Sequence, residues 1–275
     1  MTSFVGRIQM EMMQVALACV VGLAFGSFAN VFIHRWPQGG SITHPRRSAC
    51  PECGIHIRAV DNMPVVSWVL LRGRCRDCEA AISPRYLIVE ALMGLLFVAV
   101  TLVWGIDPLL PGLLVMTWSM VVASFIDLEH QIIPNRLTLR LPLILLPLLV
   151  AVAWYDDAWI DLRRAVIAGI ALPAGMLALS ELFRLVRGQS GIGMGDIKFA
   201  ISLGLVVGYL GGWHLVVFGY ATIIAAMVIV IGLAIAGRAS LATRIPFGPY
   251  LSVGALVTIL AGDPATALAR RVLGF

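Results

Sequence analysis

The stretch Gly193-Met194-Gly195-Asp196-Ile197-Lys198-Phe199 places an acid behind two glycines, at the start of a long apolar run that begins at Phe199. A charged side chain deep in a bilayer costs roughly 2.5–3.5 kcal/mol on insertion scales. The glycines on either side of Met194 leave room for another backbone to come close to the acid. Asp196 is therefore either a helix-start acid favoured by the helix dipole or part of a functional site.

The composition predicts a polytopic membrane protein. Of the 275 residues, 60% are hydrophobic and only 13% are charged, and the mean hydropathy is +0.93. Soluble domains carry roughly 25% charged residues. The first apolar segment, 12–33, lacks a convincing cleavage site and is expected to be a retained span. The net charge of +5 comes from 19 arginines and Lys198, and membrane topology explains it better than nucleic-acid binding does.

Length and apolarity predict about eight transmembrane helices, or seven if the sixth and seventh are continuous. The expected spans are 12–33, 85–104, 108–126, 137–155, 163–186, 196–211, 213–236 and 248–262. If the loop 34–85 is cytoplasmic, 15 basic residues lie on that side of the membrane and 5 on the other. This asymmetry satisfies the positive-inside rule. Asp127 and Asp196 are then expected at the same depth, at the cytoplasmic face.

The chain is expected to divide into an N-terminal transmembrane helix at 1–33, a cytoplasmic insert at 34–84 and a membrane-embedded core at 85–275. The insert contains two C-x-x-C pairs, which are Cys50, Cys53, Cys75 and Cys78. Four thiolates in two such pairs can surround a tetrahedral Zn²⁺ ion and leave no open position for catalysis. Two disulfides, or one redox-active pair, are the alternatives, but thiols stay reduced in the cytoplasm. A structural zinc site is the preferred interpretation.

The two aspartates suggest a chemistry. Two carboxylates a few ångströms apart share one proton, so one can take a proton from water while the other polarises a carbonyl. This is general acid–base hydrolysis of a peptide bond without a covalent intermediate. Pro134 prevents the helix that carries Asp127 from continuing, so this acid lies just before a bend. Glu90, inside the second expected span, is either a functional residue or one half of a structural salt bridge with an arginine.

Several motifs in order resemble the type IV prepilin peptidases, also called prepilin leader peptidase/N-methyltransferases. The resemblance covers nearly the whole chain. It is carried by 26–37, the four cysteines, 83–90, Ile126-Asp127 with Ile133-Pro134-Asn135, 193–198 and 245–251. The family often has an aspartate where this chain has Asn135, and this departure leaves the two aspartates unaffected.

The resemblance implies an aspartic endopeptidase in which Asp127 and Asp196 are the catalytic pair. It implies that basic leaders of prepilins, or of type II secretion pseudopilins, are cut after a glycine at the cytoplasmic face of the bacterial inner membrane. The four-cysteine insert is typical of members that also methylate the new N-terminus with S-adenosylmethionine. No glycine-rich nucleotide-binding loop locates the methyl donor in the sequence, and the candidates for its site are Glu90 and the stretch 26–37. The supporting residues of the two aspartate motifs are Gly193, Gly195, Lys198 and Pro134.

Three alternatives stay open. Presenilin-like proteases also use a Gly-x-Gly-Asp aspartate, but the zinc-type insert and the Ile-Pro-Asn segment disfavour an enzyme that cuts within the membrane. A proton-coupled transporter is expected to have acids near the bilayer midplane and repeat symmetry between its halves. Here the acids lie at helix ends and no such repeat is visible. A zinc-anchored scaffold without catalysis is the third alternative, and only changes to the aspartates would test it.

Overall fold

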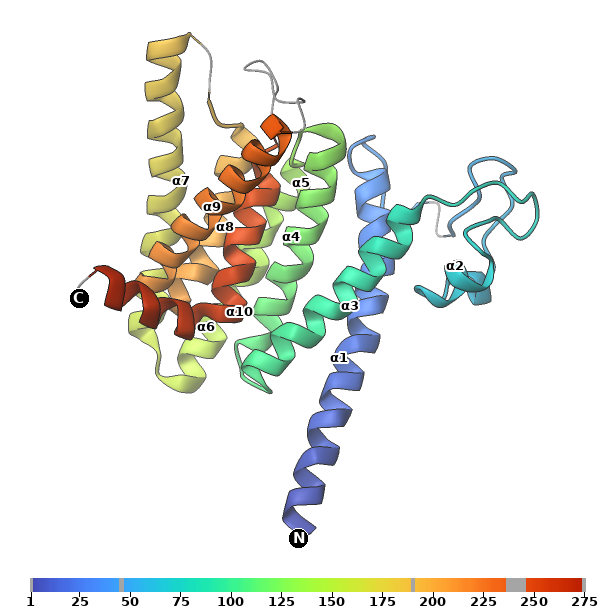
Figure 1. Ribbon diagram of the computed structural model, residues 1–275, viewed down its shortest axis with the longest axis horizontal. Helices are drawn as coiled ribbons and strands as arrows, with labels where there is room; N and C mark the ends of the chain where they lie inside the picture. The colour runs from blue at the N-terminus through green and yellow to red at the C-terminus, as the bar shows by residue number, and fades with distance from the viewer. Residues whose placement is uncertain (1, 45–46, 189–190, 236–245, 274–275) are drawn as a thin grey trace. The chain divides into compact units, whose positions relative to one another are not determined.

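The computed structural model describes residues 2–44, 47–188, 191–235 and 246–273. Within these ranges the chain is mainly helical, and the insert between the first two long helices is largely turns and irregular chain with two isolated β-bridges. The chain divides into two compact units, Met1–Ile106 and Asp107–Phe275 (Figure 1). The expected boundaries at 33 and 84 stay a prediction.

The first unit consists of two long helices that flank the cysteine-containing insert. Its elements are α1 (Thr2–Arg35), the 3-10 helix η1 (Ala59–Asn62), α2 (Val66–Leu70) and α3 (Pro84–Trp104). Small residues bring α1 and α3 into backbone contact, because a Cβ atom on Gly26 would lie 2.6 Å from Cα of Glu90. Such small-residue contacts are typical of helix pairs in membranes. The Ser83 side chain accepts a hydrogen bond from the Arg85 N–H, and Pro84 follows at the first helical position, so the start of α3 is well defined.

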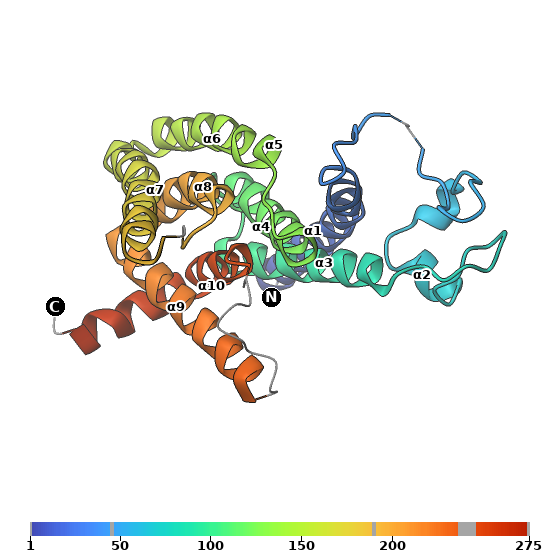
Figure 2. The same ribbon diagram turned by 90° about the horizontal axis from the view of Figure 1, so that it is seen from above.

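The second unit is a bundle of helices around α8 (Met194–Leu210). Figure 2 shows α8 surrounded by its neighbours in the view from above. The side chains of α8 are buried on most sides, as expected of a helix that is apolar all round. The other elements are α4 (Leu110–His130), α5 (Asn135–Thr138), α6 (Arg140–Asp156), α7 (Trp159–Arg187), α9 (Gly212–Ile235) and α10 (Gly248–Leu273).

Close packing fixes α8 against α7. A Cβ atom on Gly204 would lie 2.4 Å from the carbonyl oxygen of Ala168, and one on Gly208 would lie 2.5 Å from the Ala168 Cβ. Backbone atoms of the two helices therefore touch directly. This contact sets the position of the whole helix, including its first turn, which carries Asp196.

The expectation of an all-helical, polytopic membrane protein is confirmed. Six helices of the described residues are long and apolar enough to cross a membrane; they are Gln9–Arg35, Pro84–Trp104, Leu110–His130, Asn135–Asp156, Trp159–Arg187 and Gly212–Gly232. The helix α8, with 17 residues, and the apolar part of α10, Gly248–Ala261, are shorter. The expected count of eight spans is therefore not confirmed. The helices α8 and α9 are separate, because Gly211 adopts a φ of +142° between them.

Candidate active site

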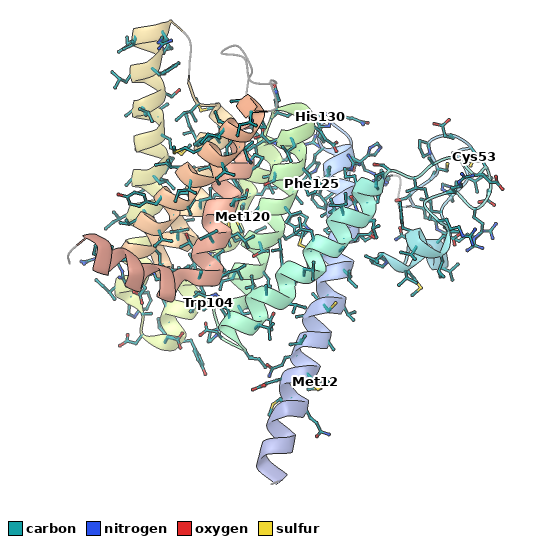
Figure 3. All side chains as sticks on the ribbon, viewed as in Figure 1. Met12, Cys53, Trp104, Met120, Phe125 and His130 are labelled. Carbon is teal, nitrogen blue, oxygen red and sulfur yellow. The ribbon has the colours of Figure 1, made fainter. Side chains whose placement is uncertain are left out.

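The ends of two helices position the aspartates. Asp127 lies in the last turn of α4, which ends at His130 because Gln131 adopts a left-handed conformation. Figure 3 labels His130 at this end of the helix. Asp196 is the third residue of α8. The helices α4 and α8 are in contact, and the two carboxylates are close enough to interact electrostatically. The structure thus brings together two acids that are 69 positions apart in the sequence.

Both carboxylates are buried, with 4% of Asp127 and 8% of Asp196 exposed. The backbone N–H of Gly248, the first residue of α10, donates a hydrogen bond of 2.9 Å to Oδ2 of Asp127. The backbone N–H of Gly193 donates to the Asp196 carboxylate. The other oxygen of Asp196, Oδ1, is buried and has no hydrogen-bond partner among the described residues. Such unpaired groups are costly, and a ligand or water is the usual explanation.

Three glycines lie close to Asp127 and Asp196, where a Cβ atom would approach neighbouring atoms within about 3 Å. A Cβ atom on Gly193 would lie 2.8 Å from Oδ2 of Asp196, and one on Gly248 would lie 2.9 Å from Oδ2 of Asp127. A Cβ atom on Gly195 would lie 3.1 Å from the carbonyl oxygen of Ile133. Where the segment after α4 meets the first turns of α8 and α10, an added side chain would displace a carboxylate or press on the backbone of Ile133.

A second contact joins the two aspartate motifs. Pro134 precedes α5, the short helix that begins with Asn135. The Nζ atom of Lys198 donates a hydrogen bond of 2.8 Å to Oδ1 of Asn135. This bond connects α8, two residues after Asp196, to the segment that follows Asp127. The supporting residues proposed from the sequence thus lie around the aspartates, and their roles stay predictions.

The sequence did not predict that the backbone N–H of Gly248 binds Asp127. The segment 245–251 was recognised as a motif, but no contact with an aspartate was assigned to it. The donor is a backbone N–H, which leaves no signature in the sequence. The available signal was the glycine between two prolines, Pro-Phe-Gly-Pro, which indicates a position where a side chain is not tolerated.

Glu90 lies in the first unit and belongs to a different cluster. Its side chain is 8% exposed, and its Oε2 atom accepts a hydrogen bond of 2.7 Å from the backbone N–H of Val65. The side chains of Ser27 and Asn30, on α1, also hydrogen-bond to it. The Oδ1 atom of Asn30 is buried without a partner in the described part of the chain. No arginine forms an ion pair with Glu90 among those residues, so the salt-bridge explanation is not supported.

The four cysteines of the insert come together as predicted. Their sulfur atoms all lie within 4.8 Å of one another, and the thiols of Cys50 and Cys78 are 3.8 Å apart. All are free thiols, so the two-disulfide alternative is not supported. Figure 3 labels Cys53 in this cluster. Four sulfur ligands in a compact group are the donor set that Zn²⁺ prefers.

The surroundings of the thiols shift the pKa values of Cys50 and Cys78 in opposite directions. Backbone N–H groups of Cys53 and Glu52 donate hydrogen bonds to the sulfur of Cys50 and lower its pKa to about 7. The Ala80 N–H lowers the pKa of Cys78, but burial and the neighbouring thiols outweigh it and raise that pKa to about 12. Thiols that crowd one another resist joint ionisation until a cation lies among them. The cluster therefore fits a structural metal ion.

Helices of membrane-spanning length, a paired-aspartate site and a four-cysteine insert define a polytopic membrane protein with a candidate acid–base site. Two family descriptions match the chain: the bacterial peptidase A24 N-terminal domain at residues 20–104, and the type IV leader peptidase family at residues 114–237. The chain belongs to the type IV leader peptidase family. The resemblance seen in its motifs is thereby confirmed.

Several named relatives are similar to the chain over most of its length. A prepilin leader peptidase/N-methyltransferase of Dichelobacter nodosus is 35% identical over 267 residues, which cover 87% of this chain and 89% of the relative. The proteins of the same name from Stutzerimonas stutzeri and Pseudomonas aeruginosa are 36% and 32% identical, and each alignment covers more than nine tenths of both chains. No solved structure matches the chain.

Proposed function

We propose that the protein is an aspartic endopeptidase of the bacterial inner membrane that removes basic leader peptides from type IV prepilins or type II secretion pseudopilins. Cleavage follows a glycine at the cytoplasmic face, and the new N-terminus is then methylated with S-adenosylmethionine. One observation carries the peptidase proposal. Asp127 and Asp196 are buried together at helix ends, and one carboxylate oxygen has no partner in the described residues. The names of the relatives support the substrate class.

The two acids differ in an unpaired oxygen. Each accepts one backbone N–H, from Gly248 at Asp127 and from Gly193 at Asp196, but the buried Oδ1 of Asp196 has no partner among the described residues. A buried carboxyl group with an unpaired oxygen costs less as a neutral acid than as an anion. We assign Asp127 as the ionised member, which takes a proton from water as the water oxygen attacks the scissile carbonyl carbon. Asp196 carries the shared proton and donates it toward the carbonyl oxygen through its unpaired Oδ1. The amide nitrogen then accepts the proton held by Asp127 and the C–N bond breaks. As the carbonyl re-forms, Asp196 takes its proton back from one of the two hydroxyl groups on that carbon.

The position of the pair suits a substrate with a basic leader and an apolar helix. Both acids lie within the terminal turns of helices rather than at mid-span. A scissile bond at the junction of a polar leader and an apolar helix would lie at this level. The basic leader is attracted by the carboxylates, and the apolar helix remains in the lipid. The same position argues against the proton-coupled transporter, whose acids are expected near the midplane.

For the methylation step, we propose that Glu90 and Asn30 form the cation-binding part of the site. S-adenosylmethionine supplies a methyl group on a positively charged sulfur. The new N-terminus of the cleaved protein is also a cation until it loses a proton. Glu90 can hold a cation and accept that proton, and the unpaired Oδ1 of Asn30 can accept a further hydrogen bond from it. The zinc ion, bound by the four cysteines, would stabilise the insert that contributes Val65 to this cluster.

The peptidase proposal is tested with purified protein and a synthetic prepilin, using mass spectrometry of the products. Wild type is compared with Asp127→Asn, Asp196→Asn and, as a control, Glu129→Gln, which changes an exposed acid two residues from Asp127. We expect cleavage after the glycine by wild type and the control only. Cleavage by either asparagine variant at the wild-type rate would refute the two-aspartate mechanism. A product cut inside the apolar helix would instead support a presenilin-like enzyme.

The methylation proposal has a separate readout. Glu90→Gln is expected to leave cleavage unchanged, while the product no longer gains the mass of one CH₂ group in the presence of S-adenosylmethionine. Glu79→Gln, a change of an exposed acid in the insert, serves as the control. A purely structural role of Glu90 would lower both activities together. Normal methylation by Glu90→Gln, with the KM for the methyl donor unchanged, would rule out the assignment.

A further inference from the structure

The short helix α2 exposes an apolar surface. Met63, Val66, Val69 and Leu70 are between 46% and 76% exposed, and we call these four residues the outer face of α2. Their spacing places the last three on one side of the helix, with Met63 one turn earlier. Contiguous exposed patches of large apolar side chains usually indicate an interaction site. The insert therefore presents a surface that needs a partner.

The orientation of α2 is fixed by its opposite side. The Ser67 hydroxyl, 6% exposed, donates a hydrogen bond of 2.9 Å to the carbonyl of Val60. The Trp68 ring donates from Nε1 to the carbonyl of Ile82 at 3.3 Å, and it packs over Gly73, where a Cβ atom would lie 2.8 Å from the ring. Because these bonds hold the inner side, the outer face cannot rotate inward to bury itself.

Two contacts set the height of α2 relative to the membrane-spanning helix α3. Val65, which precedes α2, donates its N–H to Glu90. Glu90 is six residues after Pro84, the first residue of α3, so it lies about 9 Å along the helix at 1.5 Å per residue. Ile82, the partner of Trp68, lies two residues before Pro84, the first residue of α3. The helix α2 is thus level with the first turns of a candidate span, at the end of the insert away from Cys53 (Figures 1 and 3).

Positive charge borders the outer face. Arg72 and Arg74 lie two and four residues after the end of α2, and both are exposed. Neither takes part in an ion pair with another described residue. In contrast, Arg58 and Arg76 of the same insert pair with Asp77 and Asp61. Unpaired arginines beside an apolar helix face are typical of segments that lie on anionic lipid surfaces.

We propose that the outer face of α2 inserts into the leaflet in which α3 begins, and that Arg72 and Arg74 bind anionic lipid headgroups there. The partner is the membrane that holds the protein, not a second protein. The insert is then attached at two places, through the polypeptide at α3 and through α2 in the lipid. This attachment would hold the cysteine cluster at a constant height above the membrane.

The test uses the full-length protein with benzoylphenylalanine, a photo-crosslinking residue, incorporated at position 70 in place of Leu70. The matched control carries it in place of Ile55, an exposed apolar residue whose carbonyl bonds to Cys50 beside the cysteine cluster. Both variants are reconstituted in vesicles of phosphatidylcholine, with or without phosphatidylglycerol. After irradiation, mass spectrometry identifies the adducts, and equal metal content of the two variants shows that each insert is folded.

We expect lipid adducts at position 70 in at least severalfold higher yield than at position 55. Phosphatidylglycerol adducts should exceed the share of that lipid in the vesicles, and Arg72→Gln combined with Arg74→Gln should remove this excess. Equal lipid yields at both positions would overturn the insertion. Adducts to another copy of the chain at position 70 would assign the surface to a protein partner instead. Lipid adducts without the phosphatidylglycerol excess would overturn the headgroup assignment.

Discussion

The backbone N–H of Gly248 donates a hydrogen bond of 2.9 Å to Oδ2 of Asp127, although 121 positions separate the two residues in the chain. This bond occupies one oxygen of the carboxylate and fixes the direction in which the other points. It also requires that the first residue of α10 lie directly against the acid. The geometry of the candidate site therefore depends on a helix that contributes no acid to it.

The first prediction concerns Gly248→Ala. The new Cβ atom would lie 2.9 Å from Oδ2 of Asp127 and 3.1 Å from Cδ1 of Ile133, so the carboxylate or the helix start must move. A misplacement of about 1 Å can lower an enzymatic rate about 100-fold. We expect a loss of peptidase activity of that order, measured as kcat on a synthetic prepilin, while the helical content by circular dichroism is unchanged.

The control for this variant is Gly175→Ala. Gly175 is exposed in the middle of α7, and a Cβ atom there would have no neighbour within 4 Å. The added methyl group should leave kcat unchanged. An unchanged kcat for Gly248→Ala as well would show that the contact with Asp127 does not position the carboxylate for catalysis.

The second prediction separates two glycines of the same motif. A Cβ atom on Gly195 would lie 3.1–3.2 Å from the backbone oxygen and nitrogen of Ile133, which cannot swing aside as a side chain can. A Cβ atom on Gly193 would meet only the Asp196 side chain, and the backbone angles at Gly193, φ −68° and ψ 143°, are open to alanine.

We therefore expect Gly195→Ala to lower both the thermal midpoint and the activity, at a cost of about 1–3 kcal/mol for the overpacking. Gly193→Ala should lower activity and leave the thermal midpoint close to that of wild type, because only the carboxylate moves. Differential scanning fluorimetry and prepilin cleavage, measured on the same samples, check both results. Equal thermal loss in the two variants would contradict this distinction.

The fold was predictable from the sequence to the extent that it depends on long apolar segments and on residues that end helices. Long apolar segments indicated the spans, and Pro134 correctly indicated the end of the helix that carries Asp127. The structure differs from this prediction at the start of the chain, where α1 begins at Thr2, ten residues before the expected span. The helix α8, with 17 residues from Met194 to Leu210, agrees with the expected span 196–211 to within two residues. Periodicity cannot reveal that α8 lies at the centre of its bundle, because an apolar helix facing lipid has the same sequence pattern.

The candidate site was predictable only as far as side chains identify it. The two aspartates could be picked out because acids are rare beside apolar segments, and the four cysteines because they form two C-x-x-C pairs. Their roles as catalytic and metal-binding residues stay predictions. The contacts made by backbone groups were not predictable. The N–H groups of Gly248 and Val65, which bind Asp127 and Glu90, are determined by tertiary packing and not by residue type.

The third prediction is that the insert binds one zinc ion and releases it as the pH falls. Bound thiolates must be ionised, so protons compete with the metal. The pKa of Cys50 is lowered to about 7, so its thiolate is favoured above that pH and is lost as the pH falls through it. The pKa of Cys78 is raised to about 12, so at neutral pH its proton must leave when the metal binds. Both effects make affinity for zinc rise with pH.

Elemental analysis of the purified protein, and release of zinc to a colour-forming chelator at a series of pH values, check this prediction. Cys50→Ser and Cys75→Ser are expected to lose the metal. Cys19→Ser, which changes a thiol of α1 outside the cluster, is expected to keep it. Retention of zinc by Cys50→Ser, or release that does not depend on pH, would contradict a four-thiolate site.

The fourth prediction uses the internal similarity of the two cysteine turns. The N–H of Gly54 bonds to the carbonyl of Cys50, and the N–H of Glu79 bonds in the same way to that of Cys75. Both residues adopt a positive φ, +71° for Gly54 and +59° for Glu79. A residue with a Cβ atom is strained in this region by about 1–2 kcal/mol, whereas glycine is not. The second turn therefore carries a strain that the first turn avoids.

Glu79→Gly should relieve this strain, although the greater freedom of glycine in the unfolded chain offsets part of the gain. We expect a net gain of about 0.5–1 kcal/mol, which corresponds to about a two- to fivefold higher apparent affinity for zinc in competition with a chelator. Gly54→Ala is the reverse change. Because a Cβ atom on Gly54 would meet nothing within 4 Å, any loss of affinity there reports the backbone strain alone. If Glu79→Gly weakened zinc binding, Glu79 would have to act through its side chain, and the similarity of the two turns would not extend to their energetics.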